Sequence, residues 1–77
     1  MNPMITDDVR SASEFLAALS VTHPDDESLV AQVNERFGQL GPREIARAAL
    51  YASTDPAGKP DIVLRLYKLG MQRMRRN

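Results

Sequence analysis

Residues 41–53 read GPREIARAALYAS, and this stretch carries the strongest helix signals in the chain. Gly41 stands where a helix cap is needed. Pro42 at the first helical position loses no hydrogen bond, because the N–H that proline lacks would have no partner there. Glu44 follows in the first turn, where the helix dipole favours a negative charge. Most of the helix circumference is covered by small and apolar residues, namely Ile45, Ala46, Ala48, Ala49, Leu50 and Ala52. This pattern predicts a central helix surrounded by others.

Two helices are predicted before this stretch. Thr6 is typical of an N-cap, and apolar residues then recur at helical spacing over residues 7–20. A second helix opens with the acids at 25–27 and stops near Gly38. Because only Gln39 and Leu40 join it to the central helix, we expect these two helices to pack as neighbours.

A fourth helix is predicted from Pro60 or Asp61, after a loop rich in proline and glycine. Gly70 either ends this helix as a C-cap or lies inside it, where glycine allows close contact between helices. No window shows the alternation of a strand. We therefore expect an all-α fold, a small single-domain bundle of about four short helices over residues 1–77, with 1–5 and 71–77 as candidates for flexible ends.

Length and composition limit how this chain can be stabilised and where in the cell it is expected. A domain of 77 residues without cysteine lacks disulfides, and one this small is marginally stable alone. A partner or a second copy in a homodimer would add stability. No apolar run reaches membrane-spanning length, and the first residues lack the pattern of a signal peptide. We expect a cytoplasmic protein without a membrane partner.

The sequence offers little material for catalysis. His23 is the only histidine, and no serine stands in a nucleophile motif. The acids at 25–27 beside His23 match neither a zinc site nor a calcium loop, and capping of a helix explains them. We expect no enzyme, no metal, no cofactor and no small-molecule substrate.

Charge is unevenly distributed, although ten basic and ten acidic residues give a net charge of zero. Acids crowd the first part of the chain and basic residues the end, which indicates either complementary faces or a basic end for an anionic partner. In the central helix Arg43, Arg47 and Tyr51 form one stripe at i, i+4, i+8. The stripe is either a solvated edge or a contact for nucleic acid or an acidic partner.

The segment REIARA, residues 43–48, resembles the first helix of helix-turn-helix DNA-binding domains, and PDIVLRLYKLG, residues 60–70, is similar to their recognition helix. Val63 and Leu66 stand where packing residues are expected. The resemblance implies DNA binding through the helices at 41–53 and 60–70. The connection departs from the motif, because residues 53–60 replace a turn of three or four residues.

Two hypotheses for function follow. The first is a small non-catalytic regulatory or adaptor protein that binds another protein, or a second copy of itself in a homodimer, through the fourth helix. The alternative is a divergent helix-turn-helix regulator that binds nucleic acid. The candidate binding residues under the two hypotheses are Arg43, Arg47, Tyr51, Leu64, Arg65, Lys68, Met71, Gln72, Arg75 and Arg76. Among them Arg65, Lys68 and Gln72 are expected to project together into solvent, and Leu64 and Met71 either cover the edge of the core or form an apolar contact patch.

Overall fold

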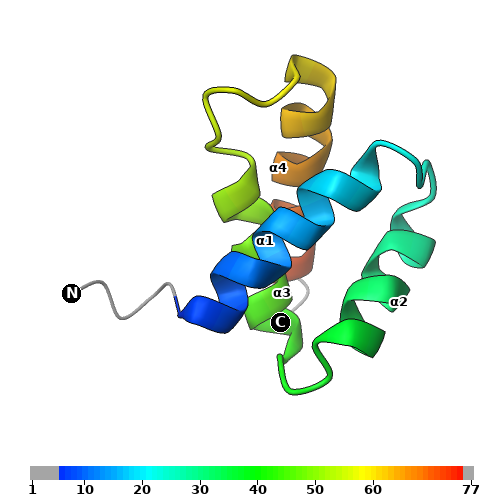
Figure 1. Cartoon of the computed structure of the whole chain (residues 1–77), viewed down its shortest axis with the longest axis vertical. Helices are drawn as coiled ribbons and strands as arrows, with labels where there is room; N and C mark the ends of the chain where they lie inside the picture. Colours follow the sequence, from blue (N-terminus) through cyan, green and yellow to red (C-terminus); the bar gives the residue numbers. More distant parts are fainter. Residues whose placement is uncertain (1–5, 76–77) are drawn as a thin grey trace.

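The computed structural model describes residues 6–75, which form four helices and no strand (Figure 1). They are α1 (Asp7–Ser20), α2 (Asp26–Arg36), α3 (Pro42–Ala52) and α4 (Pro60–Arg75). The expected all-α bundle is therefore confirmed. Within these residues, no helix is both long and apolar enough to cross a membrane.

Local capping sets where the first three helices begin. The Thr6 hydroxyl accepts a hydrogen bond from the Val9 N–H at 3.2 Å. The Asp25 carboxylate does the same for the Ser28 N–H at 3.1 Å, so Asp25 is the cap and α2 begins one residue later. At α3 the Gly41 N–H donates to the Glu44 carboxylate at 3.1 Å. The predicted starts at Thr6 and Gly41 are confirmed. They could be predicted because each cap is formed by residues three positions apart in the sequence.

The third helix lies at the centre of the bundle, packed against α1 on one side and α4 on the other. Its alanines are buried, and so is Ile45. Side chains from all four helices complete the core around it, and the largest fully buried ones are Leu16, Leu29, Leu66, Val9 and Val33. The predicted central role of residues 41–53 follows from these small side chains, which let two neighbouring helices approach at once.

Gly70 lies close against α3. A Cβ atom built on Gly70 would lie 2.7 Å from the Leu50 Cγ atom and 3.0 Å from the Ala46 carbonyl oxygen. Gly70 is buried inside α4, which continues to Arg75, so the second of the two alternatives for this glycine holds. The chain thus returns along α3 after the loop at 53–59, and residues 71–75 belong to the helix.

The second helix packs mainly on α1 and makes few contacts with α3, although only five residues separate α2 from α3. The expectation that α2 and α3 pack as neighbours is therefore wrong. The aromatic rings provide the reason. Phe37, at the end of α2, lies edge-on to Phe15 of α1 with the centroids 5.8 Å apart, and the Arg36 guanidinium lies 5.2 Å from the same ring of Phe15. These contacts hold the end of α2 against α1 before the chain reaches α3.

Candidate protein-interaction surface

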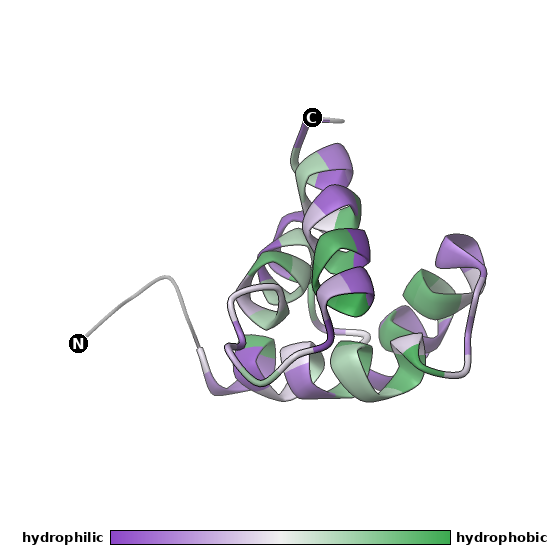
Figure 2. Cartoon of the chain, turned by 90° about the horizontal axis from the view of Figure 1, so that it is seen from above, coloured by the Kyte–Doolittle hydropathy of each residue, from purple (hydrophilic) through white to green (hydrophobic). Residues whose placement is uncertain are grey.

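The side of α4 that faces away from α3 carries large apolar side chains. Leu64 is 52%, Tyr67 50% and Met71 39% exposed. Their spacing of i, i+3, i+7 places them on one side of the helix. Lys68, Gln72 and Arg75 are exposed beside them. We call these six residues the outer face of α4; Figure 2 shows apolar and polar colours mixed along this helix, which leads to the C label.

A shallow groove runs along the outer face. One part, of about 660 Å³, is lined by Tyr67, Lys68, Met71, Gln72, Arg75 and, from the start of α2, Asp26. A second part, of about 350 Å³, is lined by Leu64, Lys68, Arg65, Asp61 and again Asp26. The structure therefore brings together six of the predicted binding residues along the groove: Leu64, Arg65, Lys68, Met71, Gln72 and Arg75. Two acids, Asp26 and Asp61, lie beside them.

Arg65 does not project into solvent, and this expectation was wrong. Its side chain is 21% exposed; Nε donates to the Asp26 carboxylate at 2.8 Å and Nη1 donates to the Ser20 carbonyl oxygen at 3.1 Å. Arg65 thus ties α4 to the start of α2 and to the end of α1. Helical spacing alone groups Arg65 with the exposed Lys68 and Gln72; the difference is that Asp26 and the Ser20 carbonyl oxygen lie within hydrogen-bond distance of the Arg65 guanidinium.

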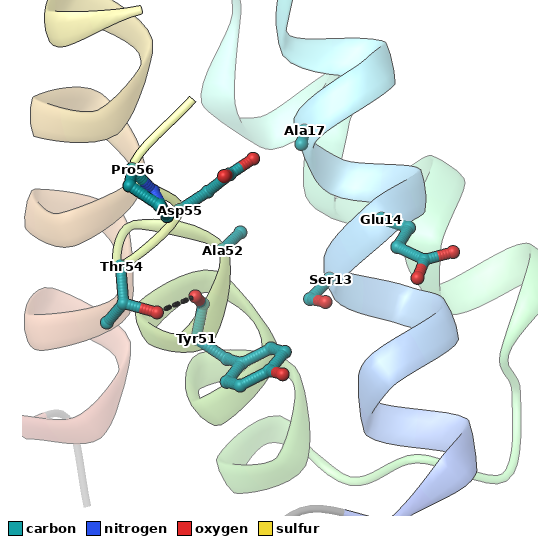
Figure 3. Close-up of a pocket in the computed structure, with 8 residues that line it drawn as sticks. All are labelled: Ser13, Glu14, Ala17, Tyr51, Ala52, Thr54, Asp55 and Pro56. Carbon is teal, nitrogen blue, oxygen red and sulfur yellow. Dashed lines mark hydrogen bonds between the residues drawn. The ribbon is translucent and has the colours of Figure 1, made fainter. Parts of the chain in front are cut away.

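Tyr51 lies on a different surface. It lines a cleft of about 450 Å³ between α1 and the end of α3, together with Ser13, Glu14, Ala17, Ala52, Thr54, Asp55 and Pro56 (Figure 3). No residue of the outer face of α4 lines this cleft. Arg43 is exposed and Arg47 half-buried on α3. The predicted stripe on α3 is thus separate from the outer face at its Tyr51 end.

Most polar side chains in the cleft at Tyr51 form hydrogen bonds with backbone groups. The Thr54 hydroxyl donates to the Tyr51 carbonyl oxygen at 2.7 Å (Figure 3). The Ser13 hydroxyl donates to the Arg10 carbonyl oxygen at 2.6 Å, and the Asp55 carboxylate accepts from the Ala57 N–H at 2.9 Å. The Glu14 carboxylate and the Tyr51 ring remain to meet solvent. The bonds of Thr54 and Asp55 hold the end of α3 and the turn that follows it.

The residues around His23 also have structural partners. His23 lies in the turn between α1 and α2, with Nδ1 3.1 Å from the Thr22 hydroxyl and 3.3 Å from the Leu19 carbonyl oxygen. Asp25 caps α2 and Asp26 pairs with Arg65. Among residues 6–75, no three side chains of the types that bind metals lie close enough to share an ion. Arg76, the last of the predicted binding residues, lies outside the described part of the chain.

Two residues of this surface were missed as binding candidates. Tyr67 was not among the predicted binding residues, although its spacing from Leu64 and Met71 is the signal that places it on the outer face. Asp26 was interpreted only as a helix-start charge, and no local pattern links it to a residue 39 positions away in the sequence.

Comparison with family models, curated proteins and solved structures found no match.

Proposed function

We propose that this chain is a small non-catalytic regulatory or adaptor protein, and that it binds another protein through the outer face of α4. The observation that carries this proposal is the exposure of Leu64, Tyr67 and Met71 on one side of a single helix. A scattered exposed apolar residue is ordinary, but three large ones side by side mark an interaction site. Tyrosine, methionine and arginine are also enriched at protein interfaces.

The charges at the groove favour a protein over nucleic acid. Lys68 and Arg75 could contact phosphates, but Asp26 and Asp61 line the same groove. The exposed Asp61 carboxylate would repel a phosphate backbone, which DNA-binding proteins contact with basic residues. Arg65 is held by Asp26 and is not free to join such contacts. Apolar anchors in the middle and mixed charges around them suit a protein surface.

The experiment captures partners from an extract of the native cells on immobilised protein, with and without nuclease. Wild type is compared with Leu64→Asp and Met71→Asp, which place a charge on the outer face. Tyr51→Asp is the matched control, because Tyr51 is similarly exposed but lies in the separate cleft. Circular dichroism confirms that each variant is folded.

We expect a partner that nuclease leaves bound, that Tyr51→Asp retains, and that the two variants of the outer face lose by about tenfold or more in affinity. Loss of every partner after nuclease would support the helix-turn-helix alternative instead. A partner lost only by Tyr51→Asp would move the binding surface to the cleft between α1 and α3.

A further inference from the structure

We infer that the partner of the outer face is a second copy of this chain, with the two α4 helices packed antiparallel across a two-fold axis. This inference rests on the proposed function, because it uses the same surface. The surface is complementary to an identical surface that runs in the opposite direction. Three features of α4 lead to this inference: its charged ends, the positions of its apolar residues and the side chains at its middle.

The two ends of the surface carry opposite charges. Asp61 is exposed in the first turn of α4 and Arg75 is exposed in its last turn. They are separated by about 21 Å along the axis at 1.5 Å per residue. When a second α4 lies antiparallel, Asp61 of each copy faces Arg75 of the other, and two ion pairs form. A parallel arrangement would instead oppose Asp61 to Asp61 and Arg75 to Arg75.

The apolar residues have nearly the same centre as the charges. Leu64 and Met71 are equidistant from a point between Tyr67 and Lys68, and Asp61 and Arg75 are equidistant from Lys68. One two-fold axis near this point therefore opposes Leu64 to Met71 of the other copy while it forms the charged pairs. Positions 61, 64, 68, 71 and 75 also follow the alternating spacing of three and four that forms the seam between two packed helices.

The middle of the surface fits the same axis. Tyr67 and Lys68 of one copy face Lys68 and Tyr67 of the other, so each ammonium group can lie against a tyrosine ring. The long lysine stem adds apolar contact while its charge stays near water. Asp26 also lines the groove beside Lys68, with its carboxylate paired to Arg65. An isologous contact of this kind closes at two copies.

The test exchanges charges between the two ends. Asp61→Arg gives a chain with two basic ends, and Arg75→Asp gives a chain with two acidic ends. Each variant alone should associate roughly tenfold or more weakly than wild type, because both ion pairs become repulsive. An equal mixture of the two variants should restore the dimer, since each basic end then meets an acidic one. Sedimentation velocity over a concentration series measures the association.

Controls separate the specific effect from net charge. Glu35→Arg and Arg10→Asp reverse exposed charges on α2 and α1 that do not line the groove, and they should leave association unchanged. Leu64→Asp should weaken association in every combination. Circular dichroism checks the fold, and restoration in the mixture shows directly that both end variants remain competent to bind.

Each contrary result has a distinct meaning. A wild-type chain that stays monomeric at all concentrations overturns self-pairing, while partner capture by the outer face would still support the proposed function. A dimer that ignores the variants at Asp61 and Arg75, or variants that fail to restore each other, overturns the antiparallel arrangement. A dimer that also ignores Leu64→Asp removes the outer face from the interaction, and only the capture experiment then decides the proposed function.

Discussion

The two sides of α4 have similar apolar content but opposite surroundings. The inner side presents Leu66 and Leu69, which are buried against the rest of the bundle, and Gly70, which meets α3. The outer face presents Leu64, Tyr67 and Met71, which the chain itself leaves exposed. A helix that is apolar on both sides usually has neighbours on both sides. Folding of one chain therefore buries the apolar side chains on the inner side of α4 and leaves those on the outer face exposed.

The largest expected difference between the two sides is in stability. Leu66→Ala should lower the free energy of unfolding by about 2–5 kcal/mol, because it leaves a cavity beside fully buried neighbours. Leu64→Ala, the same change two residues away on the outer face, should cost about 0.5 kcal/mol or less in the monomer. Urea denaturation of dilute protein measures both. Equal losses would show that the two sides of α4 do not differ in the way described.

The close approach at Gly70 predicts the next largest effect. Gly70→Ala should destabilise by about 1–3 kcal/mol, because the added methyl group would strike the Ala46 carbonyl oxygen and the Leu50 side chain. Helix propensity alone predicts the opposite sign, a gain of about 1 kcal/mol. Thermal denaturation of the variant therefore decides whether packing or propensity dominates at this position.

Gly38→Ala is the matched control for Gly70→Ala. A Cβ atom at Gly38 would meet only the Asn34 carbonyl oxygen at 3.6 Å, and Gly38 is exposed. The backbone there does not require glycine, since no glycine of the described chain has a positive φ. This variant should therefore be neutral or more stable by up to about 1 kcal/mol. A stable Gly70→Ala variant would contradict the tight contact between α3 and α4.

The smallest expected difference in stability is between substitutions of Arg65 and Lys68, two cations on α4. Arg65→Ala should cost about 1–2 kcal/mol, because it removes the ion pair with Asp26 and the bond to the Ser20 carbonyl oxygen. Lys68→Ala should cost about 0.5 kcal/mol or less. Arg65→Lys tests the geometry, since an ammonium group lacks the planar donors that reach both partners. Chemical denaturation at low and high salt compares them, and equal losses would place Arg65 in solvent.

The sequence predicts the helices of this protein well, because their signals are local. Thr6, Asp25 and Gly41 each act on an N–H or carboxylate within three residues, and the predicted boundaries agree closely with the structure. The site was predicted in part. Periodicity identifies which residues share a side of a helix, but it does not reveal which side the other helices cover.

Long-range pairings account for what the sequence did not reveal. The ion pair between Arg65 and Asp26 joins residues that have no regular spacing, so Arg65 resembled the other basic residues of α4. The position of α2 also depends on the rings of Phe15 and Phe37, whose contact follows from the path of the chain. Both features depend on how the helices are arranged in space, which spacing along a single sequence does not determine.

The attachment of α2 has a consequence for how the molecule opens. This helix is held mainly by α1, with the ion pair of Asp26 at its start and the ring of Phe37 at its end. α3 and α4 hold each other independently of it. Local unfolding occurs in such contiguous units, so the amides of α2 should exchange with solvent hydrogen before those at the centre of α3. Because Asp26 is one wall of the groove at the outer face, each such opening widens the site while its apolar floor on α4 stays in place.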